Sequence, residues 1–255
     1  MLSDKAKELF GNLELEYAPI AIKYHLVPPA NCPKSEKKMA FCQFVKEAQT
    51  TLSSFYIDKY NDDCYGKMAL GMEPKSPVGA SGQAGYDFEM YRSPIAGQQL
   101  YQKIEVLVPG TVNYVQFAPV SICDFDPDLI ICVANVEKAD ILLRATSYIS
   151  GDLWESKSSP VLSCAWMYAY PIISGKVNHI TTGMYHGLKR RKAYPAGLQI
   201  IAIPYTKIDE VVTALDQMPW TAIAFREDEE SKAEMARHRE GWAALAEQTN
   251  THFSL

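Results

Sequence analysis

The sequence predicts one compact domain of the α+β or mixed α/β class, with two similar fused halves as the alternative arrangement. Three observations indicate this class. An apolar run at residues 126–134 is bounded by turn residues, which is typical of a strand covered on both faces. Apolar residues recur at helical spacing within residues 36–52. Strand and helix signals are mixed along the chain without strict βαβ alternation.

The beginning of the chain predicts two helices with a strand between them. The first helix covers residues 3–12, and the alternation of apolar residues at 18–24 indicates a strand. The second helix lies within residues 36–52. Cys42 is about 100° from the centre of its apolar arc, by the helical period. We therefore expect Cys42 at the edge of the buried face.

The next segments are rich in turn residues. Residues 61–66 have turn chemistry, and residues 67–72 fit either a short strand or the start of a helix. Residues 73–97 contain so many prolines and glycines that we expect an irregular loop or lid. A helix at 95–105 and a strand at 111–119 are expected to follow.

The second half again alternates between strand and helix signals. After the buried strand at 126–134, helices are expected at 137–149 and 160–170. Residues 176–184 look extended, and residues 197–204 read as another buried strand.

The last part of the chain predicts two helices. Thr206 and Asp209 form a capping-box-like start for a helix that ends near Met218. The charged C-terminal segment predicts one more helix with a polar face. We divide the chain into a core domain, residues 1–222, and a C-terminal polar helix and tail, residues 223–255.

Charge and hydropathy limit the classes of partner. The 25 basic and 30 acidic residues give a formal charge of −5, whereas a phosphate backbone requires concentrated positive charge. The N-terminus lacks the pattern of a secretion signal. The longest apolar stretch, at 161–173, is far shorter than the roughly 20 residues of a membrane span. We therefore expect a cytoplasmic protein with neither nucleic acid nor membrane as its partner.

Six cysteines carry the most informative chemistry, and in a reducing compartment they are expected to be free thiols. Their spacing contains no C-x-x-C pair, but thiolates from distant segments can converge on iron or zinc. Cys42 at a helix edge, Cys64 in a polar turn and Cys164 in a helix are the best candidates. Cys132 fits a buried position in the apolar strand, and Cys32 and Cys123 are intermediate.

A basic segment supplies further candidates. His179 and His186 lie near Lys and Arg residues at 187–192. Arg190 or Arg191 could hold a carboxylate or a phosphate, and His186 could act as an acid–base group or an axial ligand. The simpler interpretation is a solvated basic loop that offsets the acidic average.

Complete catalytic motifs are absent from the sequence. Residues 79–85 resemble a glycine-rich phosphate loop only superficially, because the Lys-Ser/Thr that completes it is missing. Neither a nucleophile elbow, nor a His-Glu-x-x-His helix, nor an EF-hand loop is found. Whether the protein is an enzyme is left open at this point.

Several segments together carry a family resemblance. The helix containing Phe41-Cys42-Gln43 is followed by Cys64-Tyr-Gly-Lys-Met-Ala-Leu-Gly71. With this most specific part, the chain resembles domain-of-unknown-function family 169, the uncharacterised ArCR proteins. Pro19-Ile-Ala-Ile-Lys23 and Tyr194-Pro-Ala-Gly-Leu-Gln-Ile-Ile-Ala-Ile-Pro204 also match. The resemblance spans roughly residues 5–218. It implies kinship with proteins of archaea and anaerobic bacteria, but it implies no activity.

The family pattern often carries another cysteine near residue 185, followed by Gly and Arg, where this chain has Tyr185-His-Gly-Leu-Lys-Arg. The resemblance therefore implies His186 as the replacement ligand. Our first interpretation is a redox-associated protein that binds an iron–sulfur cluster or another metal, such as zinc, through Cys42, Cys64, Cys164 and His186. A small anionic substrate would lie near the arginines.

The second interpretation is a non-enzymatic module for a small ligand, with structural cysteines. A haem pocket with His179, His186 or Met184 as the axial ligand is a third. In each case the expected partner is a small-molecule ligand or cofactor. The many aromatic residues also favour a homodimer.

Overall fold

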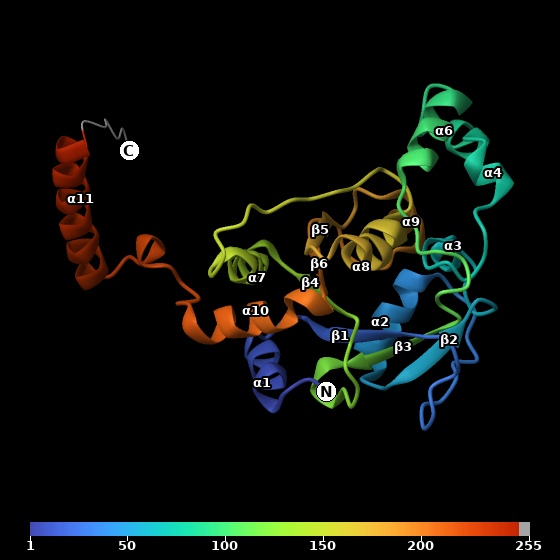
Figure 1. Cartoon of the computed structure of the whole chain (residues 1–255), viewed down its shortest axis with the longest axis horizontal. Helices are drawn as coiled ribbons and strands as arrows, with labels where there is room; N and C mark the ends of the chain where they lie inside the picture. The colour runs from blue at the N-terminus through green and yellow to red at the C-terminus, as the bar shows by residue number, and fades with distance from the viewer. Residues whose placement is uncertain (250–255) are drawn as a thin grey trace. The chain divides into compact units, whose positions relative to one another are not determined.

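A six-stranded antiparallel sheet forms the centre of the structure (Figure 1), so the predicted α+β class is confirmed. The structure is a computed structural model that describes residues 1–249. Residues 250–255, in the predicted C-terminal tail, lie outside the described residues. In spatial order the strands are β2 (Phe55–Asp58), β3 (Tyr114–Pro119), β1 (Tyr17–His25), β4 (Leu129–Ala134), β6 (Gln199–Pro204) and β5 (Asn178–Thr181).

Strand β4 is the buried strand predicted from the apolar run. It pairs with β1 on one side and with β6 on the other, and all six of its residues are buried. The first residues of the predicted segment form a turn instead of strand. There the Asp128 carboxylate accepts a hydrogen bond of 2.8 Å from the Tyr24 amide. This hydrogen bond links the end of β1 to the start of β4.

The two faces of the sheet are covered by different helices. On one face, α2 (Phe41–Thr51) packs against β1 and β3, and the Phe41 and Phe117 rings lie 5.2 Å apart. On the other face, α7 (Val136–Ser147) packs against β4 and β6. Because side chains alternate along a strand, Cys132 points away from the face that α2 covers. Its complete burial agrees with the predicted core role.

The cysteine-bearing helix is shorter than predicted. Helix α2 starts at Phe41, whereas residues 36–40 are extended and Met39 forms a bridge with Asp62. The side chain of Asn61 holds this segment by donating to the carbonyl oxygens of Ser35 and Lys37 at 2.9 and 2.8 Å. Tertiary hydrogen bonds thus override the helical spacing. Strand β2, only four residues long, was not predicted.

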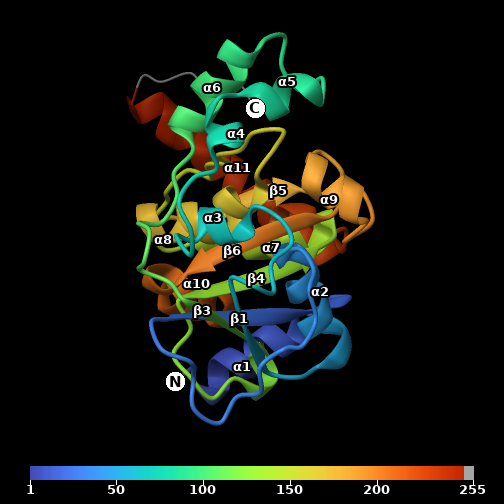
Figure 2. The same cartoon turned by 90° about the vertical axis from the view of Figure 1, so that its right-hand side faces the viewer.

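The segment after β2 is more helical than predicted. Residues 73–103 are called here the lid, and their helices lie together at the top of Figure 2. The prediction of an irregular loop at 73–97 is wrong, because Pro77 and Pro94 occupy first helical turns, where proline is favoured. The helix predicted at 95–105 is present. The helices in this region are α3 (Gly66–Ala69), α4 (Pro77–Ala80), α5 (Gln83–Asp87) and α6 (Pro94–Lys103).

The remaining predicted elements are present with shifted bounds. The helix expected at 160–170 contains a π-helix, and the one expected to be capped by Thr206 starts at Tyr205. Thr206 therefore lies inside the helix, and its hydroxyl donates to the Gly175 carbonyl oxygen at 3.1 Å. The predicted helices are α1 (Asp4–Asn12), η2 (the π-helix, Ala165–Ala169) with α8 (Tyr170–Ser174), and α10 (Tyr205–Gln217). Two further helices, η1 (Val120–Ile122) and α9 (His186–Arg191), were not predicted.

The chain divides into two compact units, Met1–Asp216 and a second that begins at Gln217. The second unit contains η3 (Ile223–Phe225) and α11 (Glu229–Thr249), the predicted polar helix. Within residues 1–249, every helix is too short or too polar to traverse a lipid bilayer. All groups discussed below belong to the first unit.

Two glycines hold the lid helices together. A methyl group added to Gly82 would overlap the main chain at Pro94 and Gln98, and one added to Gly97 would lie 2.6 Å from the Gly82 carbonyl oxygen. We predict that Gly82→Ala unfolds the α5–α6 contact, measured as faster hydrogen exchange in peptides from residues 77–103. Gly110→Ala is the matched control, because Gly110 also has a positive φ, of 87°, but has open space around it. Equal exchange in the two variants would contradict the packing role of Gly82.

Candidate functional site

Three of the predicted site cysteines line one cavity of about 80 Å³, called here the thiol cavity. Cys42 lies in the first turn of α2, Cys64 lies in the turn before α3, and Cys164 directly precedes η2. The structure thus brings together thiols that are far apart in the sequence. Other residues that line the cavity include Ala40, Tyr65, Ala84, Gly85, Phe88, Tyr101, Val161, Leu162, His186 and Arg191.

A buried carboxylate positions two of these thiols. Asp62 is 1 % exposed, and its oxygens accept hydrogen bonds from the amides of Phe41 and Lys67, at 3.1 and 2.8 Å. These amides belong to the first turns of α2 and α3, where backbone N–H groups lack partners within their own helix. One side chain therefore caps both helices and holds Cys42 and Cys64 on the same side of the cavity.

The close approach of these two helices requires glycine at position 66. A methyl group added to Gly66 would lie 2.7 Å from the Phe41 Cβ and 3.2 Å from an Asp62 carboxylate oxygen. The predicted turn at 61–66 is therefore a docking element for α2 as well as a chain reversal.

The third thiol enters the cavity from an irregular helix. Leu162, two residues before Cys164, has a left-handed backbone with φ 57°, which is uncommon for residues other than glycine. The π-helix η2 then follows, and such helices are frequent at functional sites. The side chain of Asn178 on β5 stabilises it by donating to the Trp166 carbonyl oxygen at 2.8 Å. These features fix the position of Cys164.

The rim of the cavity carries the predicted basic and imidazole groups. The Arg191 guanidinium lies 2.9 and 3.0 Å from the two carboxylate oxygens of Asp63. The His186 ring stacks on Phe88 of the lid, with ring centroids 5.1 Å apart. The lid, α9 and the Cys64 turn thus meet at the rim. Arg190 is exposed on α9 and does not line the cavity.

Burial keeps the thiols protonated. Burial, with a smaller contribution from the neighbouring Cys64, raises the pKa of Cys42 to about 12. Burial also raises the pKa of Cys164 well above its ordinary value, with added contributions from Cys42 and Cys64. The pKa of Cys64 is raised as well, mainly by burial, although Arg191 opposes that shift. The three sulfurs therefore affect one another electrostatically, but in this environment they are not thiolates.

The other predicted candidates lie elsewhere. His179 and Met184 do not line the thiol cavity. Cys32 is partly exposed and contacts Ser54, whereas Cys123 is buried and donates to the Phe125 carbonyl oxygen at 3.2 Å. Throughout residues 1–249, no set of three His, Cys, Asp or Glu side chains is spaced as ligands of a metal ion.

Several residues of the cavity were not predicted. Tyr101 lines it from the lid, where burial raises its pKa to about 12. Phe88 also comes from the lid, and no sequence spacing relates either residue to the cysteines. The turn chemistry at residues 61–66 was a signal for Asp62, but it did not indicate that this carboxylate would cap two helices.

The chain is an α+β protein with a thiol-lined cavity to which the lid contributes residues. The chain belongs to domain-of-unknown-function family 169, described as Uncharacterised ArCR, whose sequence profile matches residues 8–214. The resemblance drawn from the sequence is therefore confirmed. The matched region contains all three cavity cysteines. Neither the curated proteins nor the solved structures include a significant match to the chain.

The double cap made by Asp62 leads to a first prediction for this site. Asp62→Ala leaves the amides of Phe41 and Lys67 without their acceptor, and each buried unpaired donor costs about 1–3 kcal/mol. We expect a lower free energy of unfolding in urea by about 2–5 kcal/mol. Asp216→Ala is the control, because Asp216 pairs with Lys5 and both side chains are half exposed. A loss no larger than that of the control would show that Asp62 does not join the two helices.

Asp62 also gives a pH dependence with a definite sign. Burial raises the pKa of its carboxyl group above the ordinary value, against the hydrogen bonds from the amides of Lys67 and Cys64. The folded state therefore binds this proton more tightly than the unfolded state does. Relative to Asp62→Asn, which does not titrate, the wild-type protein should lose stability as pH rises through the folded pKa. Urea titrations of both proteins at several pH values measure this difference, and a constant difference would refute it.

The thiols are expected to react in the order of their exposure. At about pH 8, iodoacetamide should label the partly exposed Cys32 and Cys64 before Cys42 and Cys164, because alkylation requires an accessible thiolate. Mass spectrometry of peptides from native protein, quenched at intervals, gives the four rates. Cys132 is the internal reference for a fully buried thiol. Labelling of Cys42 as fast as that of Cys32 would mean that the cavity is open to solvent.

Proposed function

We propose that the thiol cavity binds a soft metal cofactor, an iron–sulfur cluster or a single thiophilic ion, through Cys42, Cys64 and Cys164. One observation carries this proposal: three thiols from distant segments line the same cavity. Sulfur donors select iron–sulfur clusters, zinc and copper(I) over harder ions. A cytoplasmic, redox-associated role is part of the proposal, and the six free thiols support a reducing compartment.

The three thiols are suitable donors for such a cofactor, but the distances between their sulfur atoms would have to become shorter. The thiols are protonated and would have to release their protons on binding, which is the usual coupling of metal affinity to pH. The sulfurs would also have to approach one another, because the described side chains form no ready ligand set. His186 could serve as a further ligand after leaving its stack on Phe88. The lid that carries Phe88 is the element that would have to move.

The rim supports a small anionic substrate as the molecule on which the cofactor acts. The Arg191 guanidinium is planar and can hold a carboxylate or phosphate with two hydrogen bonds, as it now holds Asp63. A substrate anion would replace Asp63 in this pairing. Arg190, exposed on the same helix, could add to the positive charge outside the cavity. The proposal includes no nucleic-acid partner. It includes the homodimer expected from the sequence.

A second candidate function is favoured by the character of the walls. Most residues that line the cavity are apolar or aromatic, as in pockets for small organic ligands. In this alternative the cysteines are structural and the protein is a non-enzymatic ligand carrier. A haem would require a much larger cavity. Pockets for drug-sized ligands already measure roughly 300–1,000 Å³, whereas this cavity measures about 80 Å³.

Metal analysis of protein purified without oxygen separates the two candidates. The full chain should contain iron or zinc, or take up iron with sulfide, and a cluster should add broad visible absorbance. Cys64→Ser and Cys164→Ser should lose most of the metal, because each removes one sulfur ligand. Cys32→Ser is the matched control, because Cys32 lies outside the cavity.

Two outcomes would overturn the proposal. One is wild-type protein that takes up neither iron nor zinc under any of these conditions. The other is metal retained equally in all the serine variants. An organic molecule seen by native mass spectrometry in metal-free wild type and in Cys64→Ser alike would establish the second candidate.

A further inference from the structure

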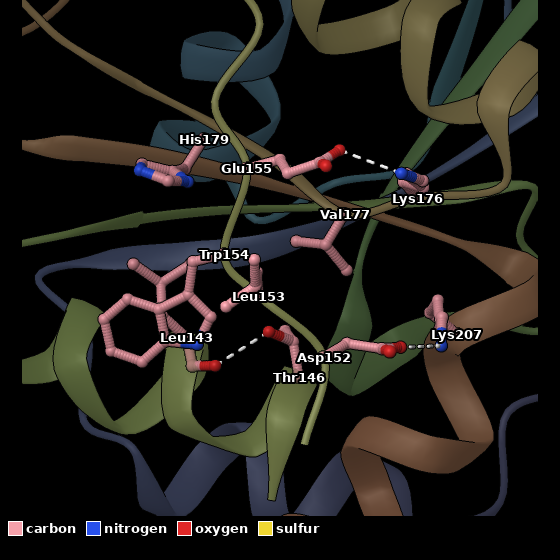
Figure 3. Close-up of a pocket in the computed structure, with 10 residues that line it drawn as sticks. All are labelled: Leu143, Thr146, Asp152, Leu153, Trp154, Glu155, Lys176, Val177, His179 and Lys207. Carbon is pink, nitrogen blue, oxygen red and sulfur yellow. Dashed lines mark hydrogen bonds and ion pairs between the residues drawn. The ribbon is translucent and has the colours of Figure 1, made fainter. Parts of the chain in front are cut away.

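A second hollow lies beside α7 and the start of β5. It measures about 300 Å³ and is called here the strap pocket, because residues 151–159 cross it without regular secondary structure (Figure 3). Its other walls come from α7, from the start of β5 and from Lys207 in α10. Its volume is that of pockets that hold small metabolites, which start at roughly 300 Å³.

The strap is attached to the sheet edge at a few points. The Ser156 hydroxyl donates to the His179 carbonyl oxygen at 2.6 Å, and the Lys157 amide donates to the Asn178 side chain at 2.8 Å. Residues 151–158 are all exposed. Ser156 and Lys157 thus attach the strap to β5, whereas Asp152, Trp154 and Glu155 are held through their side chains.

The apolar part of the pocket centres on one indole. Trp154 and Leu143 of α7 both line the pocket (Figure 3). The Trp154 Nε1 donates to the Ser147 hydroxyl at 3.0 Å. Another hollow, next to the strap pocket, shares Leu143, Trp154 and His179 with it. Trp154 thus has space beside it although it is only 46 % exposed. An apolar group could pack there against the indole.

Charges of both signs surround this apolar surface. Lys176 pairs with Glu155 of the strap at 2.9 Å, and Lys207 lies 3.8 Å from Asp152 (Figure 3). Lys207 also pairs with Glu210 at 2.6 Å. Exposed pairs of this kind contribute little to stability, and both Glu155 and Lys176 are more than half exposed. The Glu155–Lys176 pair is therefore the one that a ligand can open most easily.

The imidazole of His179 is a further polar group of the pocket. It is partly buried and has no hydrogen bond or ion pair from its ring in the described part of the chain. Burial lowers its pKa, so at neutral pH it is uncharged and can donate or accept one hydrogen bond. It adds no charge to the pocket.

We propose that the strap pocket binds an α-amino acid with an apolar side chain, whose two charges insert between Glu155 and Lys176 while its side chain packs on Trp154. A zwitterion replaces one ion pair by two and leaves neither protein charge unpaired. A simple acid would leave Glu155 without its lysine, and a simple amine would leave Lys176 without its glutamate. This site is independent of the cofactor proposed for the thiol cavity.

Three fluorinated probes test the proposal on the full chain. The probes are para-fluoro-L-phenylalanine, the acid that lacks its amino group and the amine that lacks its carboxylate, each followed by fluorine NMR. The amino acid should give saturable binding, and each single-charge probe should bind about three- to fivefold more weakly, as expected for one exposed ion pair. Glu155→Gln and Lys176→Gln should each weaken binding of the amino acid by a similar factor, and Trp154→Leu should also weaken its binding.

Lys189→Gln is the control variant, because Lys189 is exposed on α9 and lies outside the pocket. It should bind the amino acid like wild type. An acid probe that binds as tightly as the amino acid, or more tightly in Glu155→Gln, would replace the zwitterion by a simple anion and overturn the proposal. Binding that none of the pocket variants changes would place the probe elsewhere, and the absence of saturable binding would remove the site.

Discussion

The candidate site depends on one buried carboxylate. Asp62 accepts hydrogen bonds from the amides of Phe41 and Lys67, so it joins the N-terminal ends of α2 and α3. Negative charge is favourable at both ends because the helix dipoles point there. Burial opposes ionisation and raises the pKa of this group, so the hydrogen bonds compensate for a real desolvation cost. Together with the backbone bridge between Met39 and Asp62, this link fixes Cys42 and Cys64 relative to each other.

The other half of the site has a different kind of support. Cys164 stands between a left-handed residue, Leu162, and the π-helix η2, whose Trp166 carbonyl oxygen is bonded by Asn178. Neither feature is the arrangement of lowest energy for an isolated chain. The protein thus spends conformational energy beside the third thiol, while burial keeps all three thiols protonated. A metal ion bound by these sulfurs would have to displace their protons, so its affinity would rise with pH.

Sequence reasoning was most successful where a residue's role is local. The apolar run of β4, the helix containing Cys42 and the polar turn containing Cys64 could all be read from spacing and turn chemistry. The convergence of the three cysteines was proposed from their polar neighbours and a family resemblance, and no spacing rule required it. The start of α2 was misplaced because Asn61 holds residues 36–40 extended through contacts distant in sequence. Phe88 was missed because residues 73–97 were read as irregular. Tyr101 was missed although it lies in the predicted helix at 95–105, because helical spacing does not show which cavity a residue lines.

The central claim is that three cysteines from distant segments form one binding site for a soft centre. Cadmium binding followed by cadmium NMR tests it most directly, because the resonance of the ion reports how many sulfur ligands surround it. The account predicts one tightly bound cadmium ion per chain, with a resonance in the range of thiolate-rich sites that shifts when Cys42 is changed to serine. A bound ion with only nitrogen and oxygen ligands, or no bound ion, would contradict the account.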